Sequence, residues 1–482
     1  MQNYYKLEAK MARVQSLRDA AAILNWDSSV LMPESAASYR ADQMAAITES
    51  AFGLVKDNDN LELIKLAKKE DLSTIQKANL AEIEFMVTSV IAVDTELLVE
   101  FERAKLNTEV LWREARAQNN FKLVENKLID LFNLTLKIAR LKANKFGVSP
   151  YQAMINDFDR GLEEAKLDQI FNKILHDIPL ILAKVKQKQP EDYDLSMNKT
   201  DQRKLALELS KIFGFKGKID ESAHPFCGGN PYDIRMTFHI ENDFMQSMLA
   251  IIHESGHALY ERNLPRELIS QPVGGARGMA MHESQSLFME KQVGSSPEFV
   301  AWLAGFIGQE TGHHFNHGHL YDKINNVTPS FIRIFADELT YPLHVAIRYL
   351  IEKKLVNGEM TISQLPEVWD DMYEKYLGIR PTKQKEGCLQ DIHWYAGAFG
   401  YFPSYTCGAI IAAMLAKKLR EVFPDFDQKL AKADLREIMD WFKSNIHLKA
   451  STLPLKDLLI LATGSDINYE CYLNYLENKF VG

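Results

Sequence analysis

The first two hundred residues of the chain contain only four prolines, which leaves room for long, uninterrupted helices. A proline inside a helix removes a backbone hydrogen bond and clashes with the preceding turn. Between the prolines, apolar residues recur at steps of three and four, which places them on one face of a helix. The first such series is Leu7, Met11, Val14, Leu17, Ala21 and Leu24. The N-terminal half is therefore predicted to be helical throughout.

The whole chain, residues 1–482, is predicted to form a single large, mainly α domain. With 46% hydrophobic and 25% charged residues, it has the composition of a globular protein and enough apolar side chains to surround a deep central cleft. The polar stretch KQKQPEDYDLSMNKT, residues 186–200, is the best candidate for a long loop. This loop would separate an N-terminal helical lobe, residues 1–197, from a second lobe, residues 198–482.

The net charge and the apolar runs argue against several classes of partner and location. A net charge of −9 argues against nucleic acid or an anionic membrane. The longest apolar run, CGAIIAAMLA, is too short to span a bilayer, and the first residues, MQNYYKLEAK, lack the apolar core of a signal peptide. We therefore expect a cytoplasmic protein. Its four cysteines lack CxxC spacing and suit reduced thiols: Cys227, Cys388, Cys407 and Cys471.

One short sheet is predicted within the second lobe. The segment HPFCGGNPYDIRMTFHI begins with prolines and glycines that break a helix. Strict alternation then predicts a strand with one buried face, formed by Ile234, Met236, Phe238 and Ile240. From Glu241 onward the period changes back to that of a helix. The small sheet should therefore lie beside the segment that follows it.

That following segment, SMLAIIHESGHALYERNLP, holds two histidines four residues apart. On a helix, His253 and His257 are about 40° apart around the axis and about 6 Å apart along it, so both can bind one metal ion. Glu254 is placed to act as general base on a water molecule. A chance match on an ordinary helix is the alternative, but the preceding turn is apolar, and unused imidazoles in a buried helix are costly. Gly256 would allow another segment or a substrate to approach closely.

A third ligand must come from another part of the chain. Asn263 stands where one class of zinc peptidases has a third histidine, and Glu261 lies too far along the helix. The segment RGMAMHESQSLFMEKQ is predicted to be helical and offers His282, Glu283 and Glu290. Spacing does not choose between His282 and Glu283. The alternative is that these polar residues are simply solvated.

A second group of histidines lies in TGHHFNHGH, residues 311–319. His313 and His317 have the spacing of two ligands on one helix. No carboxylate lies among the histidines, and Gly312 and Gly318 suggest a loosely held helix end. A polar surface segment is the favoured interpretation, for these two residues and for His314 and His319.

Eight motifs in order along the chain resemble the carboxypeptidase Taq family of zinc metallocarboxypeptidases. They are LNWDSSVLMP, HPF, DIRMT, HESGH, HESQS, ADELTYPLHVAIRYLIE, GCLQDIHW and GAFGYFPSY. The resemblance implies a mostly helical fold with a cleft, a single zinc or cobalt ion, a cytoplasmic location and a homodimer. It also implies that His253, His257 and Glu283 are the ligands and that Glu254 is the catalytic base.

The matched motifs also suggest residues that contact the substrate. Arg348 lies on an apolar helical stretch and matches a family position expected to bind the substrate's C-terminal carboxylate; pairing with Glu352 or Glu338 is the alternative. The oxygen that gains negative charge during hydrolysis needs hydrogen-bond donors. Three side chains are candidates for that role: His393, Tyr401 and Tyr405.

The predicted function is hydrolysis of the C-terminal peptide bond of peptides, with Glu254 taking a proton from metal-activated water. Two alternatives remain. An oligo-endopeptidase would use the same chemistry without a carboxylate anchor, and would still cleave substrates with an amidated C-terminus. A non-catalytic scaffold that holds zinc is disfavoured, because a structural site usually has four protein ligands and Glu254 would have no task.

Overall fold

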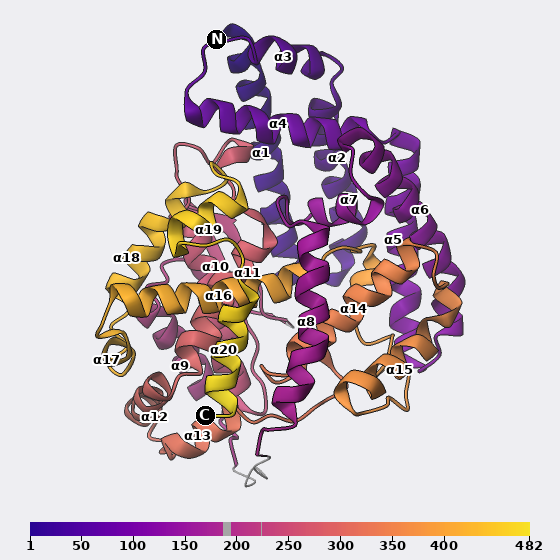
Figure 1. Cartoon of the computed structure of the whole chain (residues 1–482). Coiled ribbons are helices and arrows are strands. Elements are labelled where there is room, and N and C mark those ends of the chain that lie inside the picture. Colours follow the sequence, from indigo (N-terminus) through magenta and orange to yellow (C-terminus); the bar gives the residue numbers. More distant parts are fainter. Residues whose placement is uncertain (187–193, 223) are drawn as a thin grey trace.

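The structure, a computed structural model, describes residues 1–186, 194–222 and 224–482 (Figure 1). The N-terminal part is helical, as predicted. Its helices are α1 (Gln2–Val30), α2 (Ala37–Lys56), α3 (Asp59–Ala67), α4 (Thr74–Ile91), α5 (Thr95–Ala117), α6 (Lys122–Phe146), α7 (Pro150–Asn156), α8 (Glu164–Leu182) and α9 (Lys199–Ile212).

Helices also dominate the remainder of the chain, so the predicted mainly α fold is confirmed. These helices are α10 (Phe244–Asn263), α11 (Gly278–Leu287), α12 (Pro297–Thr311), α13 (His317–Ile324), α14 (Tyr341–Val356), α15 (Leu365–Leu377), α16 (Pro403–Val422), α17 (Phe426–Leu430), α18 (Arg436–Asn445), α19 (Leu455–Thr463) and α20 (Tyr469–Phe480). No helix among the described residues is long and apolar enough to cross a bilayer.

The predicted sheet is present and has three short strands in the order β1 (Lys218–Glu221), β3 (Asp233–Phe238) and β2 (Cys227–Asn230). β1 pairs with β3 in parallel, and β2 pairs with β3 antiparallel. Ile234, Met236 and Phe238 are buried as the alternation predicted. The strand ends at Phe238, so Ile240 does not belong to it, contrary to the prediction.

The buried apolar side chains divide into separate cores. One small core lies between the four helices α1, α2, α3 and α4 and contains buried residues from Tyr4 to Val87. The part of the chain with α3 and α4 forms the upper end of the molecule in Figure 1. A much larger core runs from Trp112 to Leu476 and contains α10, α11 and α16. Helix α10, which carries His253 and His257, is therefore a central element that is surrounded by packed helices. The predicted division at residue 197 stays a prediction.

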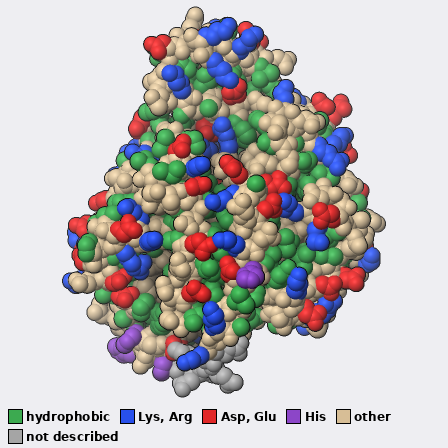
Figure 2. All heavy atoms as spheres, viewed as in Figure 1, with side chains coloured by type: hydrophobic (Ala, Val, Ile, Leu, Met, Phe, Trp, Pro, Cys, Tyr) green, Lys and Arg blue, Asp and Glu red, His purple; other side chains and the backbone are tan. Residues whose placement is uncertain are grey.

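The predicted loop of residues 186–200 lies partly outside the described residues, which exclude 187–193. Residues 194–198 are not helical, and α9 begins at Lys199. All four cysteines are free thiols. Figure 2 shows acidic and basic side chains interspersed over the visible face, without a broad patch of one sign.

Candidate metal centre

The α10 helix begins where its sequence supplies a cap. The side chain of Asp243 accepts a hydrogen bond from the backbone N–H of Met245 and so satisfies one free donor of the first turn. The next two turns are packed in the large core, with Met248, Ile251 and Ile252 fully buried. This packing fixes the helix, so the side chains that follow leave it in defined directions.

The α11 helix packs against α10 so closely that the two backbones are in contact at Gly256. A Cβ atom on Gly256 would lie 2.4 Å from the carbonyl oxygen of Gln285 and 2.6 Å from Cα of Ser286. Only glycine permits this approach, which confirms that Gly256 allows another segment close to the helix. At the start of α11, both oxygens of the buried Asp159 accept from the N–H of Ala280. The two contacts set where α11 lies and how it is rotated.

Three side chains meet between these helices. His253 Nε2 lies 3.9 Å and His257 Nε2 lies 3.5 Å from Oε2 of Glu283. Each residue has a ligand atom within 4.8 Å of the other two, and no other group of this kind occurs among the described residues. Nitrogen and oxygen ligands of a tetrahedral zinc ion lie about 3.4 Å apart, given bonds of about 2.0–2.1 Å. The donor set and its spacing therefore fit a divalent metal ion.

The other two candidates on the downstream segment have different partners. His282 Nε2 lies 2.8 Å from Oε1 of Glu261, and its ring stacks on that of His257. Glu290 Oε2 accepts from Nδ1 of His253 at 2.7 Å, on the side of the ring away from Glu283. Spacing alone did not choose between His282 and Glu283. The geometry favours Glu283, because its carboxylate is the group that lies near both histidines.

Glu254 projects from the same helix and is 8% exposed. Burial raises its pKa, and although the nearby His253 lowers it, the pKa reaches about 7. A carboxyl group with a pKa near neutrality can both accept and return a proton at physiological pH. Burial likewise lowers the pKa of His257 to about 4, which leaves its imidazole neutral and able to bind a cation.

The predicted oxyanion donors form one cluster. His393 Nε2 lies 3.2 Å from the hydroxyl of Tyr405, and the rings of Tyr401 and Tyr405 are 5.2 Å apart. Tyr405 lies three residues before Gly408 on α16, where an added Cβ would be 2.9 Å from the side chain of Glu283. Burial raises the pKa of Tyr401, and the charge of Glu283 adds to this effect. The cluster therefore lies beside Glu283, one of the three candidate ligands.

Arg348 is fully buried, with no exposed surface. Its Nε donates to Asp391 at 2.8 Å, and its Nη1 donates to the carbonyl of His344 and to the hydroxyl of Tyr373. Its Nη2 donates to Gln390 and lies 2.5 Å from Asp391. The guanidinium group is thus paired with Asp391, and not with either partner considered from the sequence.

A second arginine next to this cluster was missed by sequence reasoning. Arg333 donates from Nε and Nη2 to Asp391 and from Nη1 to the hydroxyl of Tyr341. Its guanidinium carbon lies 4.9 Å from the ring centre of Tyr405. A lone cation in the apolar run FIRIF, residues 331–335, was the available signal. Asp391 lies within the motif GCLQDIHW, but nothing in the spacing of this motif indicated that its carboxylate would pair with two arginines.

The histidines of residues 311–319 do not assemble into a metal group in the part of the chain that the structure describes. His313 precedes α13 in a non-helical stretch, so it does not share a helix with His317 as the spacing suggested. His313 Nε2 lies 3.1 Å from Asp201. The segment is largely exposed, as expected for a polar surface.

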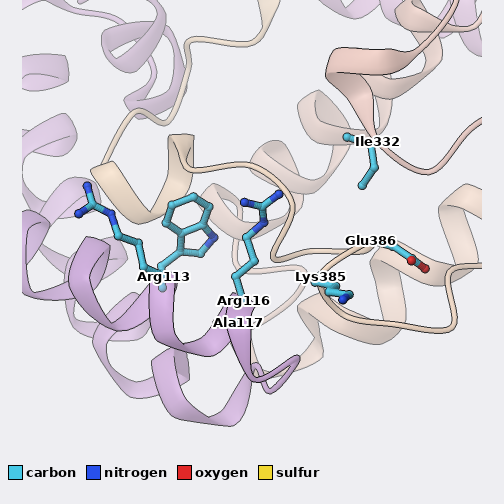
Figure 3. A pocket seen from close by; sticks show the side chains of 7 residues that line it. Arg113, Arg116, Ala117, Ile332, Lys385 and Glu386 are labelled. Carbon is cyan, nitrogen blue, oxygen red and sulfur yellow. The ribbon is translucent and has the colours of Figure 1, made fainter. Parts of the chain in front are cut away.

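A separate hollow of about 470 Å³ opens near Ile332, the neighbour of Arg333 (Figure 3). The other residues that line it come from α5 and from the loop after α15: Trp112, Arg113, Arg116, Ala117, Lys385 and Glu386. None of the three candidate ligands lines it, so the metal centre is distinct from this hollow.

Known proteins and solved structures resemble the chain over nearly its whole length. The family model for the carboxypeptidase Taq (M32) metallopeptidase matches residues 6–480. Carboxypeptidase 1 of Bacillus subtilis is 32% identical, over 98% of this chain and 96% of its own length, and thermostable carboxypeptidase 1 of Pyrococcus furiosus is 30% identical, over 98% and 97%. The solved structure of Trypanosoma cruzi metallocarboxypeptidase 1 matches with a TM-score of 0.97 and 32% identity, covering both chains completely.

Proposed function

Because the chain belongs to the carboxypeptidase Taq (M32) family of metallopeptidases, we propose that it removes single amino acids from the C-termini of peptides. From the geometry of its site, we further propose that His253, His257 and Glu283 are the ligands of one zinc or cobalt ion. That it is a metallocarboxypeptidase, a peptide hydrolase, follows from the family itself. The observation that carries the proposal is the meeting of three donor groups from α10 and α11 beside a buried glutamate.

The residues present suit such an ion. Two imidazole nitrogens and one carboxylate oxygen are the ligand types of catalytic zinc sites, which use three protein ligands and keep one position open. When bound, the ion would act as a Lewis acid and favour ionisation of a water molecule near pH 7. The side chains of His253, His257 and Glu283 are 21%, 14% and 15% exposed, so small molecules can reach the site.

Glu254 is proposed to be the general base. It follows His253 directly on α10, and its pKa, which burial raises to about 7, matches the task. Its carboxylate would take a proton from the attacking water and later pass it to the nitrogen of the departing amino acid. Because Glu254 is almost completely buried, the proton would not be exchanged readily with bulk solvent between these two events.

Tyr401, Tyr405 and His393 are proposed to stabilise the oxygen that gains negative charge when the peptide carbonyl is attacked. A phenol can donate its hydroxyl proton to such an oxygen, and the raised pKa of the buried Tyr401 keeps that proton in place. His393 lies 3.5 Å from Asp391 through Nδ1 and 3.2 Å from Tyr405 through Nε2. It would orient the hydroxyl of Tyr405.

A carboxypeptidase also needs a cation for the free carboxylate of its substrate. The direct role predicted for Arg348 stays a prediction, and its contacts favour an indirect one, since every N–H of its guanidinium has a partner within the protein. Arg333 keeps N–H groups without a partner among the described residues and lies against Tyr405. We propose that Arg333 binds the carboxylate and that Arg348 holds Asp391, which in turn holds Arg333.

The test uses a mixture of peptides with free C-termini and the same peptides amidated. Stepwise loss of single C-terminal residues, seen by mass spectrometry and abolished by a chelator, is expected for the free peptides. Little cleavage is expected for the amidated ones. Internal cleavage of both sets at similar rates would instead identify an oligo-endopeptidase, and no cleavage of either set would leave a metal-holding scaffold.

Cytoplasmic location and assembly as a homodimer complete the proposal. Four free thiols suit a reducing compartment. The homodimer is supported by the family resemblance alone, and light scattering on the purified protein would decide it. Peptides are the proposed partners, and the net charge of −9 gives no basis for nucleic acid or an anionic membrane surface.

A further inference from the structure

We propose that Glu290 is a positioning residue of the metal site, whose carboxylate holds the ring of His253 so that Nε2 of this histidine points at the ion. This inference rests on the proposed function, because it concerns the same site. Glu290 is not one of the three proposed ligands. It acts through His253 and would affect how tightly the ion is held.

The contact between the two side chains fixes the tautomer of the ligand. Glu290 Oε2 lies 2.7 Å from Nδ1 of His253. A carboxylate only accepts hydrogen bonds, so Nδ1 carries a proton, and in the neutral ring that binds a metal the lone pair is then on Nε2. Nε2 is the nitrogen that lies 3.9 Å from Glu283. Metal-bound histidines in proteins commonly have such a carboxylate on their other nitrogen, where it also fixes the plane of the ring.

Glu290 is itself held in place by its own neighbours. Its second oxygen lies 2.6 Å from Nζ of Lys291, and its backbone carbonyl accepts a hydrogen bond from Oγ of Ser295 at 2.9 Å. Residues 288–294 form a π-helical segment, an uncommon conformation that is frequent at functional sites. The carboxylate that orients His253 therefore has little freedom of its own.

The second histidine ligand has no equivalent support. Nδ1 of His257 is buried and has no hydrogen-bond partner among the described residues. Its ring stacks on that of His282, with 4.5 Å between the ring centres, and packs edge-on against the ring of His253 at 4.9 Å. Among the two histidine ligands, orientation by a hydrogen bond at Nδ1 therefore depends on the pair formed by Glu290 and His253. Loss of this one carboxylate would leave both imidazoles without a fixed tautomer.

The chain contains a matched pair that serves as a control. Glu261 and His282 are 2.8 Å apart, and the side chain of Glu261 is 20% exposed, compared with 16% for Glu290. Both pairs thus join a half-buried glutamate to a histidine beside the site. The difference that the control uses is that His282 does not belong to the proposed ligand set. Glu261 also contacts Nε2 of its histidine, whereas Glu290 contacts Nδ1.

The experiment measures the dissociation constant of Zn²⁺ from the full chain by competition with a chromogenic chelator. Glu290→Gln keeps an acceptor oxygen, and the double variant Glu290→Ala, Lys291→Met removes the pair without leaving a buried cation unpaired. The double variant is expected to bind zinc about 10–100-fold more weakly, and Glu290→Gln less so. The dissociation constant of zinc from Glu261→Gln is expected to stay within about threefold of the value for the unmodified chain. Circular dichroism in excess chelator shows that each variant is folded.

Three results would overturn the inference. Unchanged zinc affinity in both Glu290 variants, with normal binding and hydrolysis by the unmodified chain, would remove the role of Glu290 and leave the proposed function intact. Weaker binding in Glu261→Gln together with unchanged Glu290 variants would make His282 the ligand. An unmodified chain that neither binds zinc nor hydrolyses peptides would overturn the proposed function and the inference together.

Discussion

Gly256 and Gln285 lie so close that a single methyl group on Gly256 would be 2.4 Å from the carbonyl oxygen of Gln285. The first residue belongs to the helix that carries His253 and His257, and the second to the helix that carries Glu283. The glycine between the two histidines therefore has a task of its own. It lets the two helices meet at the distance at which their side chains can share one ion.

Gly256→Ala is expected to destabilise the protein and weaken metal binding. Alanine favours a helix over glycine by about 1 kcal/mol, but overpacking a core costs about 1–3 kcal/mol, and here the neighbour is backbone that cannot rotate away. The expected sum is a net loss of up to about 2 kcal/mol, measured by chemical denaturation, with a higher dissociation constant for zinc. Gly305→Ala, on an open face of α12, is the control and should stabilise by about 0.5–1 kcal/mol. Equal effects of the two substitutions would contradict the packing argument.

Glu254→Gln is expected to retain metal and lose turnover. The side chain is not one of the three proposed ligands, so the metal content should stay near one ion per chain. Removal of the general base should lower kcat by about 10²-fold or more. Metal analysis and steady-state kinetics on the same preparation check both parts. A variant that turned over at nearly the normal rate would exclude Glu254 as the base.

One metal ion is expected per chain, between His253, His257 and Glu283. Anomalous scattering at the zinc edge would give one peak there and none at His313 and His317, which the structure does not bring together in one metal group. Chelation should abolish hydrolysis, and Glu283→Gln should prevent its recovery at a zinc concentration that restores the unmodified chain. A second peak among the histidines of residues 311–319 would show that they bind metal after all.

Arg333→Ala is expected to raise the barrier for cleavage of peptides with a free C-terminus by about 2–4 kcal/mol, the cost of removing one partner of a buried charge pair. It should hardly change the slow cleavage of amidated peptides. The ratio of kcat/KM for the two substrates measures this directly.

Arg348→Ala distinguishes the two roles considered for that residue. If Arg348 acts through Asp391, both substrates should be affected, and the variant should unfold more easily because a buried carboxylate loses one of its partners. A loss confined to free C-termini, with unchanged stability, would support the direct contact predicted from the sequence.

Stability is expected to depend on pH through Glu352. Burial is the main cause that raises the pKa of its carboxyl group from 4.5 to about 7. Below pH 4.5 the carboxyl group is protonated in both states. Between pH 4.5 and 7 the unfolded chain releases this proton and the folded chain keeps it, so the contribution of Glu352 to stability falls as pH rises. The fall amounts to about 3 kcal/mol. Urea denaturation at pH 5 and pH 8 should show a steeper decline for the unmodified chain than for Glu352→Gln, and parallel profiles would contradict it.

Several parts of the molecule were predictable from sequence because they depend on local geometry. Spacings of three and four placed Leu7, Met11 and Val14 on one buried face of α1, and alternation placed Ile234 and Met236 inside the sheet. The i, i+4 spacing alone put His253 and His257 on one side of a helix. In each case the backbone conformation fixes the direction of the side chain, and the rest of the fold need not be known.

Tertiary structure decided what local geometry left open. His282 and Glu283 are adjacent and leave their helix about 100° apart, so only the rotation of α11 against α10 determines which one faces the two histidines. The close contact at Gly256 sets that rotation. In the same way, a lone arginine on an apolar helix indicated a task for Arg348, but its partner, Asp391, lies 43 residues further along the chain. Such pairings depend on packing between distant segments, which no spacing within one helix encodes.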